Sequence, residues 1–297
     1  MLILRKRRAF LHNAVLFGLA TALLQAAEPL PGQNLAQAEI RYQHTDYQGS
    51  LALLNKNTQN AATNFLIGRD YFMLGVWKDA TESLLKATQA EPNNSEYVDW
   101  LGRAYGKRAE TANPLLAPGL ASRARDSFER AVELNPKNSD ALSDLFDYYL
   151  NAPGFMGGGY EKAVNVSEKM AALDPPEGYS EKARLAQKRK EYATAEANLR
   201  QAIAVQPQGV GLWVNLARFL ATQGRTTESD EVFRSAEKVD PNTAHRVWYA
   251  RADLLIKQKR DLNEARALLQ KYLHAPVTPD DPPKEQALRL LKKVAGA

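Results

Sequence analysis

The chain of 297 residues contains no cysteine, which excludes disulfide bonds and zinc sites built on cysteine. Histidine is scarce as well: beyond residue 27 there are only His44, His245 and His274, without the spacing of metal ligands. No motif ties any of them to a nucleophile. The sequence therefore predicts no metal site, no catalytic residues and no enzymatic activity. The alternative, a pair of carboxylates converging from distant parts of the chain, stays open.

Nucleotides and nucleic acids are excluded on different grounds. The glycine-rich stretch 154–159 is not followed by the Gly-Lys-Ser/Thr sequence of a phosphate-binding loop, so no nucleotide cofactor is expected. The formal net charge is +5, but residues 1–27 hold four basic residues and no acidic ones, which leaves +1 for the rest. A nucleic-acid-binding protein needs a basic patch on its folded part, so no nucleic-acid partner is predicted.

Long apolar runs are also missing. The longest, residues 14–24, has 11 residues, whereas a helix that spans a bilayer needs about 20. A basic stretch, Arg5 to Arg8, precedes this run, and Ala26 and Ala27 follow it, which is the order of a secretory signal peptide. We expect residues 1–27 to be a signal peptide cleaved near Ala26 or Ala27, with the protein periplasmic or secreted and not inserted in a membrane afterwards. An uncleaved N-terminal anchor is the alternative.

An internal repeat organises the remainder of the chain. Five prolines, each after a polar residue that ends an apolar helical pattern, stand at positions 92, 136, 175, 207 and 241. Their spacings are 44, 39, 32 and 34 residues, and the first two become 34 when insertions of 10 and 5 residues are removed. A fixed period of this length is the mark of a stacked repeat architecture.

Small residues recur at positions 8, 20 and 27 of each 34-residue unit, and larger apolar residues at positions 7, 11 and 24. The units from Ala61 and Ser95 carry Gly68, Tyr71, Ala80, Leu84, Ala87, Leu101, Gly102, Tyr105, Ala124, Phe128 and Ala131 at these positions. This pattern resembles the tetratricopeptide-repeat (TPR) family over residues 61–273. The resemblance implies an all-α fold, a right-handed α-solenoid of helix-turn-helix repeats with helices A and B in each.

The recurring residue types have physical reasons. Glycine or alanine is needed where helix A approaches helix B or the next repeat, and proline ends helix B because it has no N–H to donate. Asn94 and Asn138 are placed to cap the helices that follow. The unit from Ser139 departs from the pattern with Phe146 at position 8 and Met170 at position 27, so its packing is expected to be looser or shifted.

The ends of the array are less regular. Residues 28–60 read as a degenerate helix pair, and the last of about six repeats begins near Arg246. Residues 274–283 are rich in proline and aspartate and read as a linker. Residues 284–297 contain one amphipathic helix that we expect to cap the stack. The alternative is a free helix that binds a partner.

Two features suggest where a partner binds. The insertions, within residues 106–121 and 151–160, enlarge the same edge of the solenoid, and the second holds Phe155 and Met156 in a glycine-rich loop. The alternative is that its glycines only permit a tight reversal. On the concave side, position 9 of four repeats is arginine: Arg69, Arg103, Arg184 and Arg218.

Guanidinium groups bind carboxylates, so the four arginines favour an acidic protein or peptide partner. The alternative is pairing within the protein, as Asp99 and Arg103 can make at i,i+4. Taken together, the sequence predicts an exported TPR scaffold that binds another protein or peptide through its concave groove and enlarged loops. A structural repeat protein that self-associates through helix 284–294 is the alternative.

Overall fold

The computed structural model describes residues 31–295, so the predicted signal peptide lies outside the described residues. Every regular element within this range is a helix. The helices are α1 (Pro31–Gln43), α2 (Tyr47–Leu53), α3 (Ala61–Met73), α4 (Trp77–Ala90), α5 (Ser95–Thr111), α6 (Ala117–Leu134), α7 (Ser139–Asn151), the short 3₁₀ helix η1 (Gly154–Met156), α8 (Tyr160–Leu173), α9 (Pro175–Lys188), α10 (Tyr192–Val205), α11 (Val210–Thr222), α12 (Thr226–Val239), α13 (Ala244–Lys257), α14 (Leu262–His274) and α15 (Lys284–Ala295).

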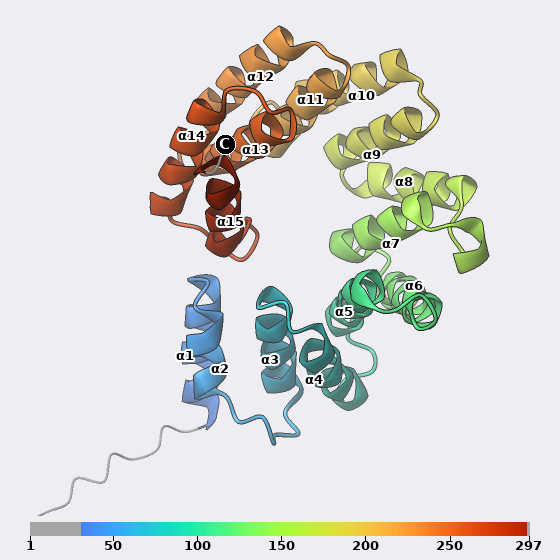
Figure 1. Ribbon diagram of the computed structural model, residues 1–297. Helices are drawn as coiled ribbons and strands as arrows, with labels where there is room; N and C mark the ends of the chain where they lie inside the picture. The colour runs from blue at the N-terminus through green and yellow to red at the C-terminus, as the bar shows by residue number, and fades with distance from the viewer. Residues whose placement is uncertain (1–30, 296–297) are drawn as a thin grey trace, which may run out of the picture.

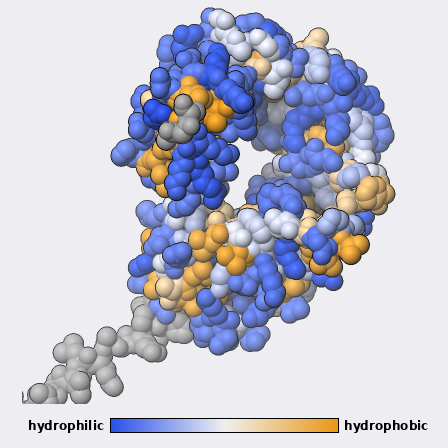
Figure 2. Space-filling view, in the orientation of Figure 1, coloured by the Kyte–Doolittle hydropathy of each residue, from blue (hydrophilic) through white to orange (hydrophobic). Residues whose placement is uncertain are grey.

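Six helix pairs, α3–α4 to α13–α14, form repeats 1 to 6 of an α-solenoid, as predicted. The odd-numbered helices α3 to α13 are the A helices and line the inside of the curve, and the B helices form the outside (Figure 1). The solenoid curls into a nearly closed ring with an opening through its middle (Figure 2). The last elements, α13 to α15, thereby come to face the first pair, α1 and α2 (Figure 1).

The close approach of helices A and B depends on small residues. A Cβ atom added to Gly102 would lie 2.6 Å from the ring of Phe128 on α6, so only glycine fits there without movement. Ala80, Ala124 and Ala131 are fully or almost fully buried, in agreement with their predicted positions. Phe146 and Met170 are also buried, so the third repeat accommodates the two larger side chains in its core.

The helix starts are capped as the sequence indicates. The side chains of Asn94 and Asn138 accept hydrogen bonds from the backbone N–H groups of Tyr97 and Ala141. Asn138 also donates to the hydroxyl of Ser95, 2.8 Å away in the preceding repeat. The cap of one repeat therefore fixes the start of its neighbour as well.

The two insertions take different forms. The first is absorbed mainly by helix, because α5 continues to Thr111 and α6 begins at Ala117. The second forms η1, followed by Gly157 with a φ of +88°. A Cβ atom on Gly158 would lie 1.9 Å from the carbonyl oxygen of Ala152. Two of the glycines in this loop are thus required by its backbone geometry.

The sixth repeat begins at Ala244, two residues before Arg246. In its helix A, Tyr249, Ala252 and Leu255 are buried, and Ile256 is partly buried against the same core cluster. In its helix B, Ala265, Leu269 and Tyr272 are fully buried.

Helix α15 packs against α13 and α14 at the end of the stack. Ala287 and Val294 are buried, and Arg266 donates to the carbonyl oxygen of Val294 at 2.6 Å. Among residues 31–295, no helix is both long enough and apolar enough to cross a bilayer.

Candidate partner-binding surface

The four arginines predicted to line the groove each reach a carboxylate on the inner helix of an adjacent unit. Arg69 on α3 lies 3.6 Å from Glu39 on α1, and Arg218 on α11 lies 3.9 Å from Asp253 on α13. The two central arginines make closer pairs: Arg103 on α5 with Asp144 on α7 at 2.5 Å, and Arg184 on α9 with Asp147 on α7. The arginines form the predicted ladder along the inner face, and each joins neighbouring units of the solenoid.

Arg103 is the centre of a cluster of carboxylates. It lies 3.1 Å from Asp99, which is the pairing within one helix that the sequence suggested, and 3.8 Å from Asp140. Asp99 is only 1% exposed, and burial raises its pKa even though the charge of Arg103 opposes that effect. Its Oδ1 atom is buried without a hydrogen-bond partner. One arginine therefore pairs with three carboxyl groups, and one oxygen of Asp99 receives no hydrogen bond.

Arg184 has a similar environment in the fourth repeat. It contacts Glu181 at 3.0 Å as well as Asp147, and its guanidinium lies over the ring of Phe146. Burial raises the pKa of Glu181 to about 8, against the opposing charge of Arg184, and burial also raises the pKa of Glu177. Carboxylates again outnumber the basic groups.

The two outer members of the ladder differ from this pattern. The guanidinium of Arg69 lies 4.1 Å from the ring centre of Tyr42 and is also close to Phe65 and Trp100, so aromatic rings cover it. Arg218 is half exposed and lines a cavity of about 500 Å³. Arg246 and the linker residues Asp280 and Asp281 line the same cavity, so an acidic segment of the chain itself already lies at this end of the inner face.

On the inner face of repeats 2 to 4, carboxyl groups outnumber the basic groups that contact them, although burial raises the pKa of both Asp99 and Glu181 to about 8. The carboxyl groups are Asp99, Asp140, Asp144, Asp147, Glu177 and Glu181, and the basic groups that contact them are Arg103 and Arg184. The side chain of Asp140 is 80% exposed and has only the long contact to Arg103. Asp140, and Asp147 with a side chain that is 48% exposed, are available to basic groups of a ligand, whereas Asp99 and Glu181 are buried.

The second predicted element, the glycine-rich loop, presents one of its two candidate side chains. Phe155 is 84% exposed, while Met156 is half-buried and its carbonyl oxygen accepts a hydrogen bond from the hydroxyl of Tyr148 at 2.8 Å. The loop is thus fixed against α7 with Phe155 pointing outward. The loop and the arginine ladder do not form one site, because the ladder lies on the inner helices and the loop at the turn between helices A and B.

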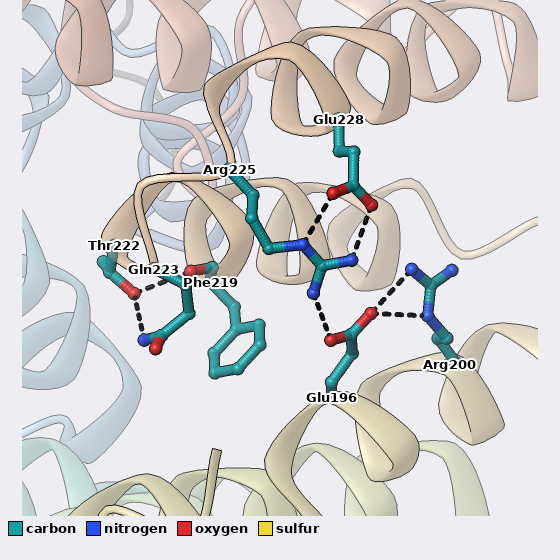
Figure 3. A network of polar contacts seen from close by, with 7 residues as sticks. All are labelled: Glu196, Arg200, Phe219, Thr222, Gln223, Arg225 and Glu228. Atoms are coloured by element: carbon teal, nitrogen blue, oxygen red, sulfur yellow. Dashed lines mark hydrogen bonds and ion pairs between the residues drawn. The ribbon is translucent and has the colours of Figure 1, made fainter. Parts of the chain in front are cut away.

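A second set of ion pairs, which the sequence reasoning missed, joins the outer helices. The arginine just before helix B in repeats 4, 5 and 6 pairs with a carboxylate near the start of the previous helix B: Arg189 with Glu161, Arg225 with Glu196, and Arg260 with Asp230. Figure 3 shows the middle pair, in which Arg225 also binds Glu228 and Glu196 also binds Arg200. The separations of 28, 29 and 30 residues are nearly constant, and that periodicity was the available signal.

The two ends of the solenoid enclose the largest cavity described, of about 970 Å³. Residues 45–48, at the start of α2, line it together with residues 72–77 of the first repeat and the end of α5, and residues 279–283 and α15 line it from the other end of the solenoid. The linker here is held by Asp281, which accepts hydrogen bonds from the backbone N–H and the hydroxyl of Thr278 and lies 2.7 Å from Arg246. We call this junction the seam.

Comparisons with known proteins agree with this architecture. Residues 186–254 match the family model described as Tetratricopeptide repeat. The chain is also similar to Tetratricopeptide repeat protein 37 of Xenopus laevis, with 22% identity over 246 residues. That match covers 80% of this chain but only 15% of the relative's length.

Two solved structures share the fold. A thermophilic TPR protein from Thermus thermophilus has a TM-score of 0.53 and 21% identity, over 65% of this chain and 100% of its own. A tetratricopeptide repeat protein from Parabacteroides merdae has a TM-score of 0.53 and 16% identity, over 89% of this chain and 100% of its own. The chain therefore has the fold of a TPR solenoid, an architecture whose extended concave surfaces generally bind other proteins.

Proposed function

We propose that the protein is an exported scaffold that binds a basic segment of another protein along the inner face of repeats 2 to 4. The observation that carries this proposal is the pair of exposed carboxylates, Asp140 and Asp147, on α7 beside Arg103 and Arg184. A lysine or arginine side chain of the ligand would pair with the exposed Asp140 and Asp147.

The inferred charge of the partner differs from the acidic one that the arginine ladder favoured. Arg103 and Arg184 already have carboxylate partners, so an acidic ligand would have to displace them. Arg218, with its nearest carboxylate at 3.9 Å, is the one ladder member with a weak contact and half exposure. An acidic ligand would therefore be confined to the end of the inner face where Asp280 and Asp281 lie.

The mapping experiment compares the inner and outer helices. Affinity capture with residues 28–297 supplies a partner, and its affinity is then measured for two variants with matched charge changes. Asp140→Lys with Asp147→Asn changes the inner face, and Asp126→Lys with Glu133→Gln changes the exposed side of α6. We expect the inner variant to lose at least about tenfold in affinity and the outer one to retain it.

Other outcomes identify the alternatives. Equal losses in both variants would exclude the inner face, and loss only with Arg218→Glu would indicate an acidic partner at the seam end. A mass in light scattering that rises with concentration would favour a self-associating structural protein. Export is tested separately by N-terminal sequencing of the protein from the host, where a start near residue 27 or 28 is expected.

A further inference from the structure

Exposed apolar side chains gather on one edge of the solenoid. We call the turns between helices A and B of repeats 1 to 4 the A–B edge; they comprise residues 74–76, 112–116, 152–159 and 189–191. Most of the large exposed apolar residues of the described chain lie there or next to it: Leu74, Val76, Leu115, Leu116, Phe155 and Tyr192. Leu115 and Phe155 are 91% and 84% exposed, and they lie in the two insertions.

Several backbone N–H groups of the exposed tips are already hydrogen-bonded, although that of Phe155 is not. The side chain of Asn113 accepts hydrogen bonds from the backbone N–H groups of Leu115 and Leu116, at 2.9 and 3.2 Å. Beyond Phe155, the N–H groups of Met156, Gly157 and Gly158 bond to carbonyl oxygens within the loop. Backbone donors that are already bonded can enter an apolar layer without the cost of lost hydrogen bonds. These loops can therefore bury their tips in such a layer as they stand.

Basic side chains accompany the apolar ones. The turn of repeat 4 contains Arg189, Lys190 and Glu191 after the exposed Lys188, and Arg189 is paired with Glu161. Arg108 lies in the last turn of α5, near Lys107, which is paired with Glu110. The opposite edge, between helix B and the next helix A, consists mainly of asparagine, glutamine and proline, with Glu91 and Asp174 against Lys137. Lys188 and Lys190 thus make the turn of repeat 4 basic on the same edge as the exposed apolar side chains.

We propose that the A–B edge of repeats 1 to 4 binds the surface of an anionic membrane. The side chains of Leu115, Leu116 and Phe155 would enter the boundary between headgroups and acyl chains, and the basic residues would contact anionic headgroups. The apolar side chains stand on separate turns at the rim of the ring, and Figure 2 shows apolar surface where Figure 1 places the α7–α8 turn. A fluid surface accepts separate projecting side chains without a matching set of pockets.

This contact concerns only the surface of the bilayer, and it leaves the inner face free. The carboxylates around Arg103 lie on α5 and α7, on the inside of the ring. A solenoid that stands with its A–B edge on a membrane would keep that face open to a protein ligand. The membrane contact and the proposed binding of a basic segment therefore stand or fall independently.

The test is co-sedimentation with lipid vesicles, either of phosphatidylcholine alone or with added phosphatidylglycerol. Both the full chain and a chain beginning at residue 28 are used, because the apolar residues 14–24 bind lipid by themselves. The tip variant is Leu115→Ser, Leu116→Ser and Phe155→Ser. The matched control is Leu173→Ser and Val205→Ser, which removes side chains with 42% and 47% exposure beside the opposite edge.

We expect the shortened wild-type chain to bind the anionic vesicles and bind the neutral ones weakly. The tip variant should lose at least about tenfold in vesicle partitioning, and the control should bind like the wild type. Lys188→Glu with Lys190→Glu should lower binding to the anionic vesicles only. Circular dichroism checks that each variant is folded.

Three results would overturn the proposal. The shortened chain fails to bind either kind of vesicle, or the tip variant and the control lose binding equally. In the third, the tip variant binds vesicles normally but no longer retains a captured protein, which would assign the edge to a protein partner.

Discussion

The guanidinium Nε of Arg103 lies 2.5 Å from Oδ2 of Asp144, although 41 residues separate the two in the chain. The contact joins the inner helices of repeats 2 and 3 above the buried Asp99. Arg103, which its position in the repeat assigned to ligand binding, therefore holds two neighbouring repeats together. Its counterpart Arg218 makes only a long contact and is the natural control.

Replacing Arg103 should cost much more stability than replacing Arg218. Arg103→Met leaves Asp99 and Asp144 without their cation in a buried site, and we expect a loss of about 2–4 kcal/mol in the free energy of unfolding. Arg218→Met breaks a half-exposed contact, and we expect a loss under about 1 kcal/mol. Urea unfolding followed by circular dichroism measures both, and equal losses would show that the Arg103 cluster has no special role.

Stability should fall as the pH rises from about 4.5 to about 8. Burial raises the pKa of Glu181 to about 8 in the folded protein, so the folded state holds a proton that the unfolded state has released. Its contribution is complete below the unfolded pKa and is lost as the pH rises through about 8. The slope for this group approaches about 1.4 kcal/mol per pH unit, and Asp70, with its pKa raised by burial to about 7, adds in the same direction.

Two glutamine variants isolate the contribution of Glu181. Glu181→Gln should flatten the dependence of the melting temperature on pH. Glu196→Gln should leave it unchanged in this range, because hydrogen bonds from Arg225 and Arg200 lower the pKa of Glu196. A pH profile that is identical in wild type and Glu181→Gln would contradict the assignment. The charged groups that face Glu181 are Arg184, Glu177 and Asp147.

Two glycines of α5 should respond to alanine in opposite directions. Gly102→Ala places a Cβ atom 2.6 Å from the ring of Phe128, and we expect a loss of about 1–3 kcal/mol. Gly106→Ala meets no atom within 4 Å and should gain about 0.5–1 kcal/mol, since alanine favours a helix. Thermal melts compare the two, and Ala131→Trp, at a fully buried position, should also be strongly destabilising. A loss with Gly106→Ala as large as that with Gly102→Ala would contradict the register of the second repeat.

Asp281 should control the attachment of the C-terminal helix. Burial alone would raise its pKa, but hydrogen bonds from Thr278 and His245 and the charge of Arg246 outweigh burial and lower it. Its contribution is therefore present above the unfolded pKa and is lost as the pH falls through the folded value. Asp281→Asn should speed hydrogen exchange across residues 278–295 and leave repeats 1 to 4 unchanged. Asp280→Asn, at the exposed neighbouring position, is the control and should have no effect.

The sequence was sufficient for the architecture because local constraints repeat in every unit. Gly102, Ala124 and Ala131 occupy the close contacts that their spacing indicates, and Asn94 caps the helix that follows it. The sixth repeat is less regular, because the buried small residue of its helix A, Ala252, lies one position before position 8 of a unit counted from Arg246.

The site could be predicted only in part, because its chemistry comes from contacts between repeats. Arg184 and Asp147 are 37 residues apart, and their pairing depends on how far one repeat rotates against the next. The residue pattern of a single repeat does not predict that rotation. The conformation of the first insertion could not be predicted for a related reason. Its residues form helix because the lengthened α5 and α6 pack against each other.

The seam gives this repeat protein a property that a straight array lacks. Each repeat contributes a small rotation, and in a curled stack these rotations add up around the ring until they meet where α1 and α2 face residues 279–283 and α15. A slight change in any repeat, such as a ligand spreading two inner helices, would therefore alter the gap at the seam by the accumulated amount. The distance between the two ends of the solenoid therefore depends directly on its curvature.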